Sequence, residues 1–274
     1  MQNIRMVALD LDGTVFNDQK QITPRTLQAI RTALDKGVVV LPATGRTLTG
    51  VPEAFSAMPG VRYALTSNGA AVYDLQTGEQ FVYLPLQADL ALALYDLVAP
   101  FGGSICVFVA GKAYVSEQEN EQVLATVDTA LVPYLKASRS FVPDLRAFLA
   151  AHADCVEKFS LMYADEATRD AVWQAVQTAY PDVEAATSIP RNLELNAPGV
   201  TKGRGLMALA EKLHLVRAQV MACGDSGNDR AMIEAAGLGV AMGNATEDIK
   251  AVADYVTADN NHDGVAEAIE KFVL

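Results

Sequence analysis

The sequence predicts an α/β protein whose doubly wound parallel sheet is interrupted by an inserted α+β domain. Three observations support this expectation. Short apolar runs alternate with helical patterns in the first and last thirds of the chain, the middle third carries a hairpin signal, and the length of 274 residues exceeds that of a usual single domain. Apolar runs flanked by helices are typical of parallel strands that are covered on both faces.

The N-terminal third supplies the first strands of this sheet. Residues 4–9 form a compact apolar run, and residues 22–36 follow as a helix with a Thr-Pro start and a glycine after its end. Two further apolar runs, at residues 38–43 and 63–66, are expected to be strands. Pro42 cannot donate a ladder hydrogen bond, so we expect a local irregularity where the first of these two strands ends.

The C-terminal third repeats the alternation, which makes the whole a Rossmann-like core. The expected strands lie at residues 219–223, 238–242 and 255–257. The expected helices lie at residues 201–213, 229–236, 247–253 and 264–272. Because helices separate consecutive strands, a parallel sheet is favoured over an antiparallel one.

The middle of the chain has a different organisation. Two strand-like runs at residues 105–109 and 113–116 are joined by Gly111-Lys112, which is a hairpin signal. Helices are expected at residues 88–98, 119–134 and 166–179, and further strands at residues 156–163, 183–187 and 193–196. We therefore predict two domains, a core made of residues 1–83 and 192–274 and an inserted α+β domain made of residues 84–191.

The charge of the chain limits its partners. The formal net charge is −12 and the pI is near 4.7, so the surface repels nucleic-acid backbones and anionic membranes. It also repels a phosphorylated metabolite, unless a metal ion and fixed donors reverse the local field. Three widely spaced cysteines and the lack of a long apolar segment favour a soluble cytoplasmic protein without disulfides. We expect a monomer or a small homo-oligomer with no nucleic-acid and no membrane partner.

Acidic residues gather where predicted parallel strands end. Asp10 and Asp12 directly follow the first strand, and Asp225 follows the strand at residues 219–223. The carboxyl ends of parallel strands meet at one edge of the sheet, where open α/β sheets bind their ligands. Like charges so close together repel each other unless a cation or a proton is shared. We therefore expect such a cation or shared proton at this edge.

Two more segments are predicted at the same edge. Thr44-Gly45-Arg46 ends a strand before a helix start, where a hydroxyl and a backbone N–H can cradle a phosphate. Lys202 stands at the start of a C-terminal helix. Each segment alone is ordinary turn or cap material, as is the segment of residues 224–229. All of these segments are predicted to lie at the same edge of the sheet and in a fixed order along the chain, so together they indicate a functional site more specifically than any one of them does.

This set resembles the haloacid dehalogenase-like phosphatases, and within them the Cof-type subfamily with a large inserted cap of the IIB type. The matching segments are residues 10–14, 44–46, 199–203, 224–229, 240–245 and 263–266. The resemblance covers residues 2–82 and 193–274, whereas the middle of the chain is similar only in size and layout.

The resemblance implies a role for each matching residue. Asp10 would be the nucleophile that forms an aspartyl-phosphate, and Asp12 the general acid and base. Mg²⁺ would be held by Asp10, by Asp12 through its backbone carbonyl, and by Asp225. Lys202 would offset the negative charge around Asp10. Contacts to the phosphate or the substrate would come from Leu11, Thr44, Gly45, Lys202 and Asn228.

Three further positions have less defined roles. Asp229 could be a water-mediated metal ligand or an orienter of Lys202, and a plain early-helix charge that complements the helix dipole is an equally good interpretation. Arg46 and Arg191 could reach the substrate near the hinge of the cap, although charge at a linker is ordinarily a surface feature.

These roles imply a hydrolase, namely a phosphomonoester phosphatase that acts on a small phosphorylated metabolite. The substrate could be a sugar phosphate or the phosphate of a nucleotide or cofactor. Two alternatives stay open. A phosphosugar mutase or phosphotransferase would use the same Asp10 intermediate. A non-catalytic phospho-accepting switch of the receiver type also uses acidic residues, a threonine, a lysine and Mg²⁺, although receivers are much shorter.

Overall fold

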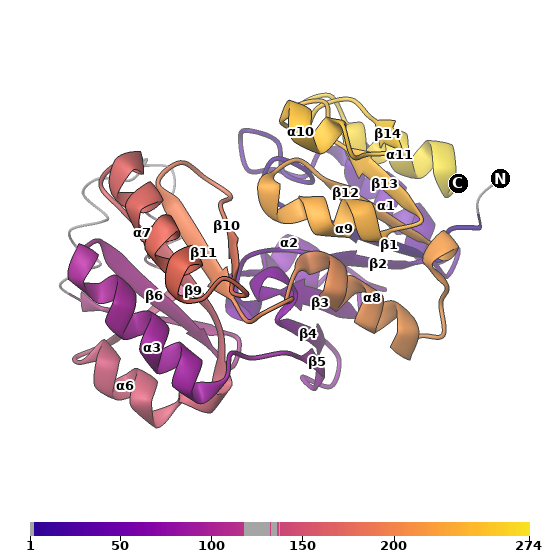
Figure 1. Ribbon diagram of the computed structural model, residues 1–274. Helices are drawn as coiled ribbons and strands as arrows, with labels where there is room; N and C mark the ends of the chain where they lie inside the picture. The colour runs from indigo at the N-terminus through magenta and orange to yellow at the C-terminus, as the bar shows by residue number, and fades with distance from the viewer. Residues whose placement is uncertain (1–2, 118–131, 133–135, 137) are drawn as a thin grey trace. The chain divides into compact units, whose positions relative to one another are not determined.

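The computed structural model describes residues 3–117, 132, 136 and 138–274 (Figure 1). The helix expected at residues 119–134 therefore lies almost entirely outside the described residues. The chain separates into two compact units. The first consists of Met1–Gly45, Val51–Tyr83 and Thr201–Leu274, and the second of Arg46–Gly50 and Leu84–Val200.

A five-stranded, fully parallel sheet forms the centre of the first unit. Its strand order is β14-β13-β12-β1-β2. The strands are β1 (Met6–Leu9), β2 (Val39–Pro42), β12 (Val220–Gly224), β13 (Leu238–Ala241) and β14 (Tyr255–Val256). Because β1 lies between β2 and β12, the carboxyl ends of the N-terminal and C-terminal strands meet at one edge.

Helices cover both faces of this sheet. On one face, Ile30 of α1 (Pro24–Asp35) and Ile269 of α11 (Gly264–Phe272) pack with Val7, Leu9 and Val240 in one buried cluster. On the other face, α9 (Arg230–Ala235) contacts β12 and β13 and packs beside α8 (Lys202–Lys212). Two short helices, α2 (Glu53–Ser56) and α10 (Glu247–Lys250), complete the unit. The doubly wound α/β prediction is confirmed.

A small antiparallel sheet follows the edge strand β2. The ladder of β2 ends at Pro42, and the next residue, Ala43, forms an isolated parallel bridge with Leu65. This is the irregularity that the proline predicted. The sheet consists of β3 (Tyr63–Thr66), β4 (Ala71–Asp74) and β5 (Gln80–Tyr83). The expected strand at residues 63–66 is therefore present, but its main partner is antiparallel, and β4 and β5 were not predicted.

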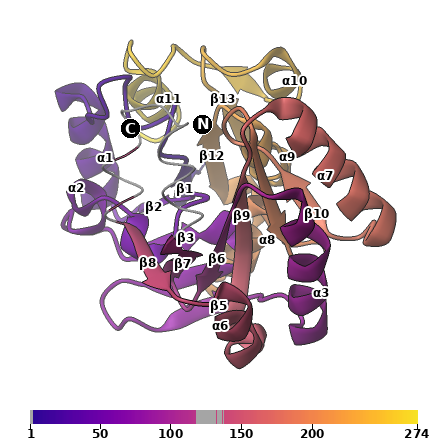
Figure 2. The ribbon, with the colours of Figure 1, turned by 90° about the vertical axis from the view of Figure 1, so that its left-hand side faces the viewer.

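A six-stranded mixed sheet forms the second unit, in the order β10-β11-β9-β6-β7-β8. Its strands are β6 (Ser104–Val109), β7 (Lys112–Ser116), β8 (Arg139–Val142), β9 (Val156–Met162), β10 (Glu184–Ala186) and β11 (Asn192–Asn196). Its described helices are α3 (Ala88–Val98), α6 (Leu145–Ala151) and α7 (Glu166–Ala179). Helix α3 packs beside both α6 and α7 (Figure 2). This unit has the expected α+β character.

Two details of the second unit differ from the sequence-based expectation. The β6–β7 hairpin turns at Ala110-Gly111, both with positive φ, and not at Gly111-Lys112, because Lys112 already pairs with Val109. The strand β11 belongs to the second unit because it lies between β9 and β10. The division of the chain therefore falls after Val200 and not at residue 191.

Two negative findings complete the description. Among the residues that the structure describes, no helix is long and apolar enough to cross a lipid bilayer. All three cysteines lie within the described part of the chain, and they form no disulfide.

Candidate active site

A fully buried lysine joins two aspartates at the carboxyl edge of the parallel sheet. Asp10 follows β1, Lys202 begins α8, and Asp229 precedes α9. The Nζ of Lys202 lies 2.7 Å from Asp10 Oδ1 and 2.6 Å from Asp229 Oδ1, and the lysine side chain is 0% exposed. Residues that are 192 and 27 positions apart in the sequence thus form one ionic cluster.

Close backbone packing places Lys202 in this position. Thr201 caps α8 by accepting a hydrogen bond from Arg204 N at 3.1 Å. A Cβ on Gly203 would lie 2.2 Å from Ala231 O, and one on Gly205 would lie 2.7 Å from Gly69 O. Only glycine lets the first turn of α8 approach its neighbours so closely.

Asp225 lies beside this cluster and is held by the loop that follows Asp10. Thr14 Oγ1 donates to Asp225 Oδ1 at 2.7 Å. Gly13 has a φ of +81°, and a Cβ there would lie 2.5 Å from Asp225 Oδ2. Glycine is required at position 13 for both reasons, the left-handed backbone and the missing space.

Asp229 orients both Lys202 and the loop before α9. Its Oδ1 accepts from Lys202, while its Oδ2 accepts from the backbone N–H groups of Asp225 and Ser226, each at 3.0 Å. Of the interpretations that the sequence left open, this geometry favours the orienting one.

Burial shifts the acid–base properties of the cluster. The pKa of Asp10 is raised well above its usual value, mainly by burial and by the negative charge of Asp229, while Lys202 partly offsets the rise. Burial and Asp229 also raise the pKa of Asp225 to about 7. Burial alone would lower the pKa of Lys202, but the carboxylates of Asp10 and Asp229 raise it above its usual range. Lys202 therefore stays protonated.

The cluster has the composition of a divalent cation site. One carboxylate oxygen from each of Asp10, Asp225 and Asp229 lies within 4.8 Å of the others. Three carboxylates face a single buried lysine, so full ionisation leaves excess negative charge. A hard cation with oxygen ligands, such as Mg²⁺, would remove this excess and restore ordinary acidity to the carboxyl groups. The side chains present thus fit the Mg²⁺ that the family resemblance implies.

Asp12 is not one of the three residues of this acidic cluster, although its negative charge contributes to the raised pKa of Asp225. Its side chain is partly exposed and accepts from Lys20 Nζ at 3.0 Å. Lys20 has a left-handed backbone with a φ of +59°, and no sequence signal pointed to it. The contact depends on how the loop after Asp10 folds back, which local patterns do not reveal.

The predicted phosphate-binding residues differ in which of their groups could contact a ligand. The backbone N–H of Thr44 is committed to Leu65 O at 2.9 Å, so a phosphate contact from Thr44 would have to use its hydroxyl. Leu11 is fully buried in the core, so only its backbone could meet a ligand. Asn228 donates to the buried Asn68 at 3.2 Å, and Asn68 N donates to Thr44 O at 3.2 Å. Asn68 links the two segments and was missed by sequence reasoning.

The two predicted arginines lie outside the acidic cluster. Arg46 belongs to the second unit and donates to Gly50 O at 3.1 Å. Arg191 has a φ of +66°, donates to Ala164 O at 3.1 Å, and precedes β11. The chain leaves the second unit beyond the other end of β11, at Val200, so Arg191 is a full strand away from that linker.

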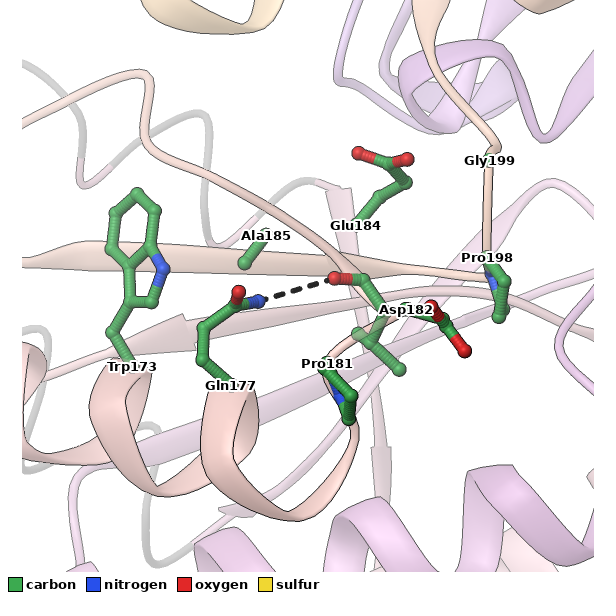
Figure 3. A pocket seen from close by; sticks show the side chains of 9 residues that line it. Trp173, Gln177, Pro181, Asp182, Glu184, Ala185, Pro198 and Gly199 are labelled. Atoms are coloured by element: carbon green, nitrogen blue, oxygen red, sulfur yellow. Dashed lines mark hydrogen bonds between the residues drawn. The ribbon is translucent and has the colours of Figure 1, made fainter.

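The second unit contains an open hollow of about 570 Å³ (Figure 3). Its lining comes from α7, the turn before β10, β10 itself and the segment after β11, namely Trp173, Gln177, Pro181, Asp182, Val183, Glu184, Ala185, Pro198 and Gly199. Gln177 braces the turn by donating to Val183 O at 3.3 Å. The hollow shares no residue with the acidic cluster.

Comparisons with known proteins agree with this arrangement. The model of a family described as haloacid dehalogenase-like hydrolase matches residues 7–269. The chain is 33% identical over 272 residues to the 5-amino-6-(5-phospho-D-ribitylamino)uracil phosphatase YcsE of Bacillus subtilis, covering 99% of this chain and 97% of that one. It is similar to the structure of a haloacid dehalogenase-like hydrolase from B. subtilis, with a TM-score of 0.86, 26% identity and coverage of 97% and 99%. It is also similar to the subclass IIB sugar phosphatase BT4131, with a TM-score of 0.80, 26% identity and 98% coverage of both chains.

Proposed function

Since the chain belongs to the haloacid dehalogenase-like hydrolases, we propose that it is a Mg²⁺-dependent phosphatase of small phosphorylated metabolites. The observation that carries the proposal is the buried Lys202, which joins Asp10 to Asp229 beside the carboxylate of Asp225. These residues support the proposal because a carboxylate that could attack phosphorus, a fixed cation and oxygens suited to a metal lie together at the edge where α/β sheets bind ligands.

The proposed reaction begins with Asp10. One of its carboxylate oxygens attacks phosphorus, the bond to the leaving oxygen breaks, and an aspartyl-phosphate forms. Asp12 donates a proton to the leaving oxygen and then takes one from the water that attacks the aspartyl-phosphate. The second step restores the Asp10 carboxylate and releases inorganic phosphate. Lys202 offsets the charge that the phosphoryl group brings to Asp10 in both steps.

The acidic cluster would hold the metal. Asp10 and Asp225 are the proposed side-chain ligands, together with the backbone carbonyl of Asp12. When bound, Mg²⁺ would neutralise charge on the phosphoryl oxygens and polarise them. Asp229 is proposed to fix the positions of Lys202 and of the backbone at Asp225, since its two oxygens accept hydrogen bonds from these two groups.

The phosphate itself is proposed to be held by the Thr44 hydroxyl, the backbone N–H of Gly45, Lys202 and Asn228. A backbone contact from Leu11 is compatible with its buried side chain. Arg46 and Arg191 stay hypotheses for substrate contacts.

Two relatives suggest the class of substrate. YcsE is named for a phosphate on a ribityl chain, and BT4131 is a sugar phosphatase. We therefore propose a sugar or polyol phosphate as the first class to test, followed by nucleotide and cofactor phosphates. The second unit, the counterpart of the family's inserted cap, is proposed to select among them. A cytoplasmic location and a monomeric or small homo-oligomeric state also stay predictions.

The test is phosphate release by purified protein from a panel of phosphorylated metabolites, with and without Mg²⁺. Asp10→Asn should abolish turnover, because an amide is not a nucleophile for phosphorus, and chelation should abolish it reversibly. Asp35→Asn, at the exposed end of α1, is the matched control and should turn over normally.

Near wild-type phosphate release by Asp10→Asn would falsify the proposed mechanism. An isomeric phosphosugar as the main product, in place of inorganic phosphate, would make the protein a mutase. A single phosphate per protein without turnover would indicate a phospho-accepting switch.

A further inference from the structure

Two turns, one in the family segment at residues 240–245 and one at residues 258–261, carry no group with a role in the proposed reaction, yet both contact the loop that follows Asp10. The turns pack backbone to backbone. Gly243 N donates to Ala258 O at 3.1 Å, and a Cβ on Gly243 would lie 2.8 Å from Asp259 N. This close packing brings Asn244 next to Asn260.

Asn244 connects the two turns to Gly13. Its Nδ2 donates to Gly13 O at 2.8 Å, and its Oδ1 accepts from Asn260 N at 3.0 Å. Because a backbone N–H can only donate, it fixes which end of the Asn244 amide is oxygen, and the nitrogen must face Gly13.

Asn260 holds the same loop further along the chain. Its buried side chain donates from Nδ2 to Phe16 O and to Asp18 Oδ1, each at 3.1 Å. Asn261 adds a second pair of bonds to Asp18 at the exposed surface. The side chains of Asn244 and Asn260 therefore donate hydrogen bonds to three acceptors in the loop, namely Gly13 O, Phe16 O and Asp18 Oδ1. Gly13 is the residue that follows Asp12.

The position of Gly13 matters for the acidic cluster. Gly13 lies so close to Asp225 that the Cβ of any other residue would approach its Oδ2 to 2.5 Å. Thr14, the next residue, donates to the same carboxylate at 2.7 Å. A shift of this turn would therefore change the separation between Asp12 on one side and Asp225 on the other.

We propose that Asn244 and Asn260 are positioning residues that fix the loop of residues 10–18 in its reactive geometry. They act through Gly13, Phe16 and Asp18 and touch no reacting atom. The inference rests on the proposed function, because the loop matters only if Asp10 and Asp12 carry the chemistry. It gives the family segment at residues 240–245 a physical role, which it shares with the turn at residues 258–261.

The first experiment compares Asn244→Ala with Asn17→Ala. Both remove the side-chain amide of an asparagine that contacts this loop, but the Asn17 amide accepts its hydrogen bond from Gln21 N, three residues beyond the loop, and not from the turns at residues 240–245 and 258–261. Asn244→Ala should lower kcat about tenfold, since small misplacements of catalytic groups are costly, while KM changes less than about twofold. Asn17→Ala should keep the wild-type kcat.

Two further readouts separate positioning from plain stability. Calorimetric titration with Mg²⁺ should show a several-fold weaker Kd for Asn244→Ala than for wild type, and thermal unfolding should show both proteins folded at the assay temperature. Wild-type kcat and Mg²⁺ affinity in the folded Asn244→Ala protein would overturn the proposal. So would an equal loss of kcat in Asn17→Ala.

A double variant tests whether the two asparagines act as one unit. If both act through the same loop, Asn244→Ala/Asn260→Ala should be no more than about twofold slower than the worse single variant. Losses that multiply would show two independent effects and would contradict the shared role.

The outcome is distinguishable from failure of the proposed function. If wild type itself releases no phosphate, the function fails, and the Mg²⁺ titrations still report whether Asn244 shapes the loop. If wild type is active and the Asn244 variant is equally active, only the positioning role fails.

Discussion

Two buried lysines among the described residues are in opposite electrostatic situations. Lys202 in the first unit faces the carboxyl groups of Asp10, Asp225 and Asp229, so the cluster has excess negative charge when all three are ionised. Lys158 in the second unit, 1% exposed, forms a 3.0 Å pair with Glu194 and lies 4.7 Å from the ring centroid of Phe108. The described partners of Lys158 balance its charge, whereas those of Lys202 do not.

The difference indicates which buried charges serve structure and which serve function. Glu194 Oε1 also accepts from Asn192 Nδ2 at 3.3 Å and from Ser188 Oγ at 3.4 Å, so its pair is enclosed by further hydrogen bonds. Such a satisfied pair holds strands β9 and β11 in register and needs nothing from solution. The Lys202 cluster has more acidic groups than basic ones, and its proposed Mg²⁺ would supply the missing positive charge.

The largest expected effect tests the Lys202 side of the comparison. Lys202→Met should lower kcat/KM by about a thousandfold, because the fixed positive charge beside Asp10 is lost. Steady-state kinetics at saturating Mg²⁺ provides the measurement, with circular dichroism to confirm folding. Activity within about tenfold of wild type would mean that the metal alone offsets the phosphoryl charge.

The second prediction tests the Lys158 side. Lys158→Met leaves Glu194 buried without its cation and should lower the free energy of unfolding by about 3 kcal/mol in urea titrations. Lys158→Met/Glu194→Leu should regain most of this loss, since the uncompensated charge is gone. If the double variant is no more stable than the single one, the pair is not the balanced unit described above.

A smaller effect should appear in the pH dependence of the metal-free protein. The pKa of Asp225 is about 7 in the folded state, above its ordinary value of 3.8, because burial and Asp229 disfavour its charge. As pH rises, the unfolded state releases this proton near pH 4, whereas the folded state keeps it until about pH 7. The free energy of unfolding should therefore fall between these two pH values. Asp225→Asn should lack this part of the slope, and excess Mg²⁺ should reduce it in wild type. Identical slopes for the two proteins would count against the assignment.

The smallest effect is expected at an exposed pair. Arg146 and Asp96 form two hydrogen bonds of 2.7 and 2.9 Å on the surface of the second unit. Water and salt already solvate both groups, so Arg146→Met should leave the urea midpoint unchanged within error. A clear loss of stability would show that exposure does not separate weak pairs from strong ones in this protein.

Much of the fold could be predicted because a long segment has enough residues to show the periodic pattern of a helix. The helices at residues 88–98, 166–179 and 264–272 occur with the predicted bounds. The missed elements are short, such as β4, β5 and β8 with four residues each, and α6 with seven. A four-residue run has too few positions to show a period, and it is stabilised by partners that lie elsewhere in the chain.

The site divides in the same way. The Lys202 cluster could be predicted because each of its members lies at a strand end or a helix start, and such positions converge at one edge of a parallel sheet. Its members are Asp10, Lys202, Asp225 and Asp229. No local pattern defines the position of four further residues, since three lie in loops and turns and one in a short 3-10 helix, namely Lys20, Asn244, Asn260 and Asn68. Their contacts with the Asp10, Thr44 and Asn228 segments follow from the folded backbone alone.

The glycine contact at the start of α8 has a consequence for any large-scale mutational survey. Gly69 and Gly205 meet so closely that a methyl group on either would collide with backbone atoms, at 2.2 Å from Thr201 O and 2.7 Å from Gly69 O respectively. A saturation screen for inactive variants will therefore collect substitutions at both positions alongside those at Asp10. These two glycines permit close backbone packing and take no part in the proposed reaction. A ranking of variants by lost turnover alone would not separate such packing positions from catalytic ones.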